Sequence, residues 1–184
     1  MIGLVAPLVA AIVLKEPALA LAALPYILRV RGRNISLVAF YAYVLTVIFV
    51  VPPSSIYEPE GLRVAVLLFT STFLLLDEIL GGIELQKDRI LLSGLLIASS
   101  VNDYATLTAM VGASLYAARS RFGKGTYYLA AWMAGSALVL YLLRENLSDP
   151  VMQAFTVVGL GVAFLLLAER NDVEFAEVSP REED

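Results

Sequence analysis

Long apolar runs, separated by short charged or proline-containing breaks, constrain this chain more than any other feature. A helix that crosses the hydrocarbon core of a bilayer needs roughly 20 residues, with a range of about 17–25. The longer runs reach this length, whereas the shorter ones are suited to thin crossings, re-entrant hairpins or halves of a broken helix. We therefore expect an all-α integral membrane protein with about 6–8 transmembrane or half-membrane helices. The runs lie at about 2–14, 17–30, 35–51, 62–80, 90–101, 104–118, 127–143 and 151–168.

The balance of residue types also indicates a membrane protein. The 184 residues are 59% hydrophobic and 16% charged, whereas soluble domains carry about 25% charged residues. We predict a single polytopic membrane domain over residues 1–172, followed by an acidic cytoplasmic tail over 173–184. Asn and Gln are scarce, which is compatible with a thermophilic source.

The chain lacks the residues that several kinds of catalytic and metal-binding site need. The chain contains no cysteine and no histidine, so thiolate, structural zinc and histidine-ligated haem sites are not expected. No catalytic constellation or phosphate-binding loop is present, and the net charge of −4 disfavours nucleic-acid binding. We predict no catalytic, cofactor-binding or metal-binding residues, and we expect the lipid bilayer and other membrane subunits as partners.

The two halves of the chain resemble each other. The hexapeptide Phe73–Glu78, FLLLDE, recurs as Phe164–Glu169, FLLLAE. Many membrane proteins that move ions or substrates are built from such internal repeats. We predict repeat 1 over about 1–81 and repeat 2 over about 88–172.

The distribution of basic residues favours one topology. If every run crosses the membrane, or each short pair enters and returns, nine basic residues share one face and three lie opposite. This bias predicts cytoplasmic termini and two parallel repeats, whereas a single broken helix in each half would split the basic clusters between faces. The first face carries Arg29, Arg31, Arg33, Lys87, Arg89, Arg119, Arg121, Lys124 and Arg170, and the second carries Lys15, Arg63 and Arg144.

Acidic residues beside the apolar runs are the candidates for a functional role, because ionisable groups inside a membrane are costly and often functional. The alternative is that these carboxylates lie at the headgroup level, where water solvates them. Glu169 is a further acid of this kind. The predicted ion-path or interface residues are Glu16, Asp77, Glu78 and Asp103.

Small residues in the second half predict close helix contacts. They are Gly112, Gly135, Ser136, Gly159 and Gly161. The last apolar run is preceded by Ser148, Asp149 and Pro150. We expect Ser148 or Asp149 to cap this helix, with Pro150 in its first turn.

Part of the second half resembles a known family. Residues 133–143, MAGSALVLYLL, are similar to the middle helix of the small three-helix subunit of respiratory complex I, the NuoK type. Residues 149–156, DPVMQAFT, are similar to the start of the last helix of the corresponding small subunit of Mrp-type antiporters. Hydrogenase-4 component E has the most similar layout, because a three-helix unit of this type follows an N-terminal helical portion. The resemblance covers most of 17–51 and 104–173.

The resemblance implies a non-catalytic subunit of a complex I-related, ion-translocating assembly. Such assemblies include membrane-bound hydrogenases, formate hydrogenlyases, Mrp-type antiporters and respiratory oxidoreductases. The subunit would pack against antiporter-like subunits and help to seal the ion path. The membrane acids of complex I members fall here at about Met133 and at Thr156 or Val157, so a carboxylate relay through this chain is not expected.

Two other functions remain open at this point. One is a self-contained small transporter or channel with a site near Glu16 and Asp103. The other is a structural subunit of a different membrane complex. If Glu16, Asp77 and Asp103 face one shared internal cavity, the transporter is favoured.

Overall fold

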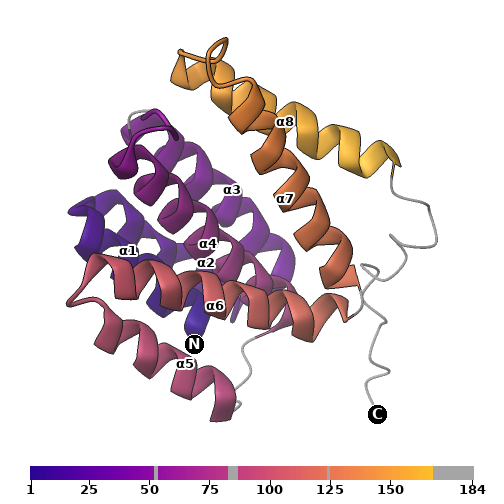
Figure 1. Ribbon diagram of the computed structural model, residues 1–184. Coiled ribbons are helices and arrows are strands. Elements are labelled where there is room, and N and C mark those ends of the chain that lie inside the picture. The colour runs from indigo at the N-terminus through magenta and orange to yellow at the C-terminus, as the bar shows by residue number, and fades with distance from the viewer. Residues whose placement is uncertain (52–53, 83–86, 124, 168–184) are drawn as a thin grey trace. The chain divides into compact units, whose positions relative to one another are not determined.

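The computed structural model describes residues 1–51, 54–82, 87–123 and 125–167, and all the regular structure in these ranges is helical (Figure 1). The prediction of an all-α chain is thereby confirmed. Packing divides the chain into unit 1, Met1–Ala117, and unit 2, which starts at Ala118 within α6. The helices are α1 (Ile2–Leu14), the 3-10 helix η1 (Pro17–Ala22), α2 (Ala23–Leu28), α3 (Arg33–Val50), α4 (Pro59–Gly81), α5 (Lys87–Ser99), α6 (Asp103–Phe122), α7 (Gly125–Leu142) and α8 (Pro150–Leu167).

Some predictions fall outside the described residues. They concern the acidic tail at 173–184, the end of the second hexapeptide at Ala168 and Glu169, and two basic residues, Lys124 and Arg170. The predicted repeat boundaries and the cytoplasmic termini also stay predictions.

A tight turn at the end of α1 reverses the chain. Lys15 adopts the left-handed conformation, with φ 57°. The N–H groups of Lys15 and Glu16 donate to the carbonyls of Ile12 and Ala11 over 3.3 and 3.0 Å, which is typical of a helix C-terminus. Pro17 then begins η1, and η1 packs back against α1. The first short pair therefore forms a helical hairpin, and whether its two segments cross a membrane stays open.

The tightest helix contact in unit 1 joins α1 to α4. Gly3, Pro7 and Ala10 are buried along one face of α1, because residues three and four apart lie on the same side of a helix. A Cβ atom at Gly3 would lie only 2.7 Å from the carbonyl oxygen of Leu74 and 2.7 Å from Oε2 of Glu78. Only a residue without a side chain allows the two backbones to approach this closely.

Among the described residues, two helices, α3 and α4, are long and apolar enough to cross a membrane. At about 1.5 Å per residue, the 18 residues of α3 and the 23 residues of α4 match a hydrocarbon core of about 30 Å. Shorter apolar helices lie at Ile2–Leu14, Pro17–Leu28 and Pro150–Ala163. The larger number of crossings stays a prediction.

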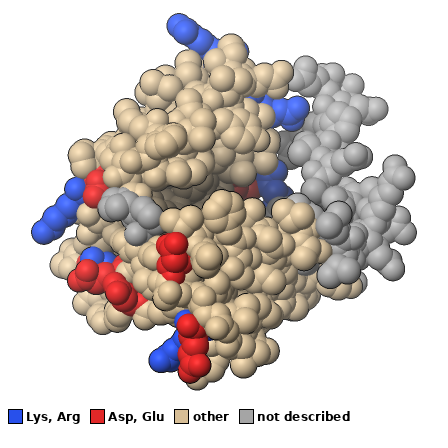
Figure 2. Space-filling view, turned by 90° about the horizontal axis from the view of Figure 1, so that it is seen from above, with Lys and Arg blue, Asp and Glu red and all other residues tan. Residues whose placement is uncertain are grey.

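Helix α3 is apolar on both its inner and its outer face. Phe40, Tyr43 and Val47 are buried in the core of unit 1. On the outer face the large apolar side chains are exposed, by 56% at Leu45 and 86% at Phe49. Figure 2 shows that charged side chains form a few small groups on the face in view, and that much of the surface between them is uncharged.

A second hairpin, formed by α5 and the first part of α6, completes unit 1 (Figure 1). Asn102 lies just before α6, and its Oδ1 accepts the backbone N–H groups of Tyr104 and Ala105 over 2.9 and 3.3 Å, as an N-cap does. Thr106 Oγ1 donates to the carbonyl of Ser99 over 2.8 Å and so ties the two arms together. Because α5 packs on α1, the beginning of the predicted second repeat belongs to the same unit as the first.

The described part of unit 2 is dominated by α7 and α8. Asp149 Oδ1 accepts the N–H of Val151 over 2.9 Å, and α8 begins at Pro150, so the predicted cap is confirmed. Trp132 of α7 donates from Nε1 to the carbonyl of Leu160 over 3.1 Å. No residue of α7 is buried.

The close contact at Gly3 leads to a stability prediction. We expect Gly3→Ala to lower the stability of unit 1 by about 1–3 kcal/mol, because the added Cβ would overlap atoms of α4. The matched control is Gly112→Ala in α6, where a Cβ would meet nothing within 4 Å. It should be neutral or stabilise by up to about 1 kcal/mol. The stability of both variants is measured by unfolding in the same detergent. Equal losses of stability in the two variants would contradict the close contact between α1 and α4 at Gly3.

Candidate functional site

Two adjacent carboxylates are buried near the C-terminal end of α4. The side chains of Asp77 and Glu78 are only 2% and 1% exposed. Leu74, Leu75 and Ile79 of the same helix are buried around them. A carboxylate in such apolar surroundings is tolerated when ionic or hydrogen-bonding partners compensate for the water that it has lost.

Glu78 is held by the beginning of α1. Its Oε2 accepts the backbone N–H of Gly3 over 2.6 Å, and its Oε1 pairs with the amino group of Met1. Burial, followed by the positive charge of Arg89, lowers the pKa of that amino group to about 6. The free N–H groups and the dipole at a helix N-terminus also favour a negative charge, so the position of Glu78 suits a carboxylate.

Asp77 is held from the other side, by α5. Arg89 Nη2 lies 3.5 Å from Asp77 Oδ2, and the Arg89 side chain is only 12% exposed. A second arginine contacts α4 slightly further along that helix. Arg29, just after α2, donates from Nε to the carbonyl of Ile79 over 2.7 Å, and a cation at the end of a helix interacts favourably with its dipole.

We call Asp77, Glu78, Arg29 and Arg89 the α4 charge cluster. Two negative side chains are balanced by two positive ones, and the contacts of these four residues reach α1, α2, α4 and α5. The described residues bring no three His, Cys, Asp or Glu side chains together in a metal-binding arrangement. The arrangement therefore acts as a polar tie between helices, in which both carboxylates are already engaged.

Two of the predicted acids lie near the opposite end of α4. Arg63, in the first turns of that helix, pairs with Asp103 at the start of α6, and the two side chains are 31% and 49% exposed. Glu16 is half-buried and lines a hollow of about 190 Å³ together with Val51 and Val64. Asp103 and Glu16 therefore lie in more open surroundings than Asp77 and Glu78.

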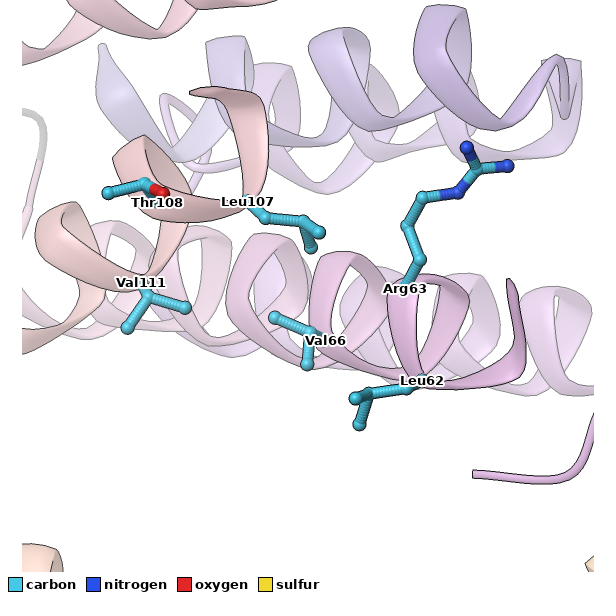
Figure 3. Close-up of a pocket in the computed structure, with 6 residues that line it drawn as sticks. All are labelled: Leu62, Arg63, Val66, Leu107, Thr108 and Val111. Atoms are coloured by element: carbon cyan, nitrogen blue, oxygen red, sulfur yellow. The ribbon is translucent and has the colours of Figure 1, made fainter. Parts of the chain in front are cut away.

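A larger hollow, of about 390 Å³, lies between α4 and α6. Figure 3 shows the side chains of Val66 and Leu107 on its two sides, with Arg63 extending from the same helix as Val66. Its lining is almost wholly apolar, which suits a hydrocarbon chain or a partner side chain better than an ion. Its residues are Leu62, Arg63, Val66, Leu107, Thr108 and Val111.

The structure thus separates the four predicted acids into two groups. Arg63 and Asp77 are 14 positions apart in the sequence, which is a distance of about 21 Å along α4. Neither of the two hollows described above contains both Glu16 and Asp77 or Asp103 in its lining.

The small residues predicted to pack closely have open surroundings within their units. A Cβ at Gly112, Gly135 or Gly159 would meet nothing within 4 Å, whereas one at Gly161 would lie 3.7 Å from Trp132. The hydroxyl oxygen of Ser136 is shielded from solvent. The role of these residues in close helix contacts stays a prediction.

Three residues of the site were not identified from the sequence. Gly3 resembles any other small residue in an apolar run, and Arg29 and Arg89 belong to basic clusters that we assigned to the membrane surface. The sequence did contain a hint that Arg89 pairs with Asp77. Arg89 follows Asp77 closely along the chain, and the predicted topology places both near the same side of the membrane. The sequence does not reveal which of the neighbouring basic residues turns inward.

The described part of the chain defines a class of protein: it is all-helical, and two of its helices are long and apolar enough to span a bilayer. Comparison with protein-family models, curated proteins and solved structures finds no match to this chain.

The two ion pairs of α4 allow a direct comparison of buried and exposed charge. We expect Arg89→Gln to destabilise the protein by about 3–5 kcal/mol, because it removes the positive charge that is paired with the buried Asp77. Arg63→Gln, which breaks the more exposed pair with Asp103, should cost about 0.2–1 kcal/mol. Thermal unfolding of both variants in the same micelles measures the two losses of stability. A similar loss of stability in the two variants would contradict the importance of the buried Asp77–Arg89 pair.

Proposed function

We propose that this chain is a polytopic integral membrane protein that acts as a non-catalytic subunit of a larger membrane complex. It packs against larger subunits and helps to close the path that ions take through them. The complex is related to respiratory complex I, of the membrane-bound hydrogenase, formate hydrogenlyase, Mrp-type antiporter or respiratory oxidoreductase kind. The chain binds no cofactor of its own.

The observation that carries the membrane location is the outer face of α3. Val38, Leu45 and Phe49 are spaced at helical intervals and are 71%, 56% and 86% exposed. Single exposed apolar residues are common on soluble proteins, but a continuous apolar face on an 18-residue helix needs a cover. Lipid hydrocarbon covers such a face without a polar partner.

The ends of α4 differ in charge in the manner of a membrane protein. Arg29 and Arg89 both contact the C-terminal part of this helix, and Arg63 lies near its beginning. An excess of arginine and lysine marks the cytoplasmic side of a membrane helix. We infer that the C-terminal end of α4 faces the cytoplasm.

The arrangement of the acids supports a subunit over a self-contained transporter. A transporter needs a central site where its ionisable groups meet. Asp77 and Glu78 are instead engaged with Arg89 and Gly3, and Asp103 pairs with Arg63 at the other end of α4. Pairs of this kind fix the positions of helices and leave ion transfer to a partner.

The kind of complex is inferred from the resemblance in residues 133–156. That stretch includes much of α7, on which no residue is buried. A helix with no buried residue and a mostly apolar sequence is suited to contact with lipid or with another subunit. We assign this helix to the interface with an antiporter-like partner.

A charged substitution on α3 tests the membrane location. Leu45→Arg should reduce insertion strongly, because arginine near the centre of a membrane helix costs about 2.5–3.5 kcal/mol. The control is Val101→Arg. Val101 lies in the turn before α6 and its side chain is 93% exposed, so we expect this position to tolerate arginine. The measurement is the fraction of each variant that stays in the membrane after an alkaline carbonate wash. Full tolerance of Leu45→Arg would contradict a lipid-facing α3.

Mild detergent extraction of the tagged chain from its own cells tests the subunit assignment. We expect mass spectrometry to identify larger polytopic membrane subunits in a fixed ratio to this chain, including an antiporter-like one. An unrelated tagged membrane protein from the same cells is the control for adventitious partners. Purification of the chain alone, together with solute transport in liposomes, would contradict the assignment.

A further inference from the structure

The turn between α2 and α3 exposes two arginines. Residues 29–33 have the sequence RVRGR. Arg29 is engaged with the carbonyl of Ile79, whereas Arg31 and Arg33 are exposed. In the part of the chain that the structure describes, the ion pairs involve Arg63, Arg89 and the Met1 amino group, and neither Arg31 nor Arg33.

Exposed aliphatic side chains lie on both sides of these arginines. Val30 is 84% exposed, Ile27 of α2 is 65% exposed and Ile35 of α3 is 50% exposed. A small soluble anion would be recognised by the guanidinium groups alone. The combination of two cations with flanking hydrocarbon surface suits a ligand that carries a negative head and an apolar tail.

Neighbouring contacts fix the position of the turn. Ser36 Oγ of α3 donates to the carbonyl of Pro25 over 2.7 Å, and Arg29 Nε donates to the last turns of α4 over 2.7 Å. The turn therefore lies where α3 begins and α4 ends, and both of these helices are long and apolar enough to cross a membrane. In a bilayer this is the depth of the headgroups.

We infer that Arg31 and Arg33 bind the phosphodiester group of an anionic phospholipid. The planar guanidinium fork fits phosphate oxygens in a bidentate manner, and the acyl chains lie along Ile27, Val30 and Ile35. Basic side chains next to the ends of membrane helices are attracted to anionic lipids by about 1 kcal/mol each, equivalent to about fivefold in affinity. The inference rests on the proposed membrane location.

The experiment compares lipids retained by the purified full chain. The wild type, Arg31→Gln/Arg33→Gln and the control Lys15→Gln/Arg144→Gln are each reconstituted in nanodiscs that contain phosphatidylglycerol and phosphatidylcholine. Both double variants remove two exposed positive charges, so they differ in place and not in net charge. Bound lipids are then counted by native mass spectrometry after release into detergent.

We expect the wild type and the control to retain phosphatidylglycerol, and Arg31→Gln/Arg33→Gln to retain it on the order of 25-fold less tightly. Phosphatidylcholine should be unaffected in all three. Equal retention by the three proteins, an equal loss in the control, or displacement of the lipid by inorganic phosphate alone would each overturn the inference. An acidic protein segment that co-purifies through the two arginines in place of lipid would also overturn it.

The outcomes separate this inference from the membrane assignment. A protein that inserts in phosphatidylcholine nanodiscs with no preference for phosphatidylglycerol leaves the membrane location intact and refutes the lipid site. A protein that stays soluble without detergent refutes the membrane location itself.

Discussion

The contact between Glu78 and the backbone at Gly3 is the constraint on which the rest of unit 1 depends. A fully buried carboxylate must find donors, and here an N–H group at the start of α1 provides one at 2.6 Å. That donor is accessible only because Gly3 has no side chain, so electrostatic and steric requirements coincide at one residue. The packing of α1 on α4 then creates the surface against which η1 and α5 pack.

The neighbouring Asp77 connects α4 to α5 in a similar way, through a buried charged contact. The side chains of adjacent helix residues point about 100° apart, so Asp77 and Glu78 contact different neighbouring helices. Glu78 meets α1 and Asp77 meets Arg89 of α5. One dipeptide thereby fixes two helices, and Arg29 adds the segment after α2. Although such pairs contribute little net stability when both partners are present, they specify which helices meet.

The sequence predicted the helical class, the breaks that end α1 and α5, and the cap of α8, because each depends on local chemistry. The run lengths, the Lys15–Pro17 break, the Asn102 break and Asp149 are all visible without tertiary information. Asp77 and Glu78 were also identified as candidates, from their carboxylates beside an apolar run. Their partners were not, because pairing over distances such as Gly3 to Glu78 depends on helix packing that periodicity does not encode.

Unit 1 has buried pairs at one end of α4 and a more exposed pair at the other. The buried Asp77 pairs with Arg89, and the buried Glu78 pairs with the amino group of Met1. Neither Arg31 nor Arg33 takes part in the ion pairs of the described residues, and both remain exposed at the same end. The proposed phospholipid site uses the positive charge of these two arginines, while the paired charges hold the helices that present it.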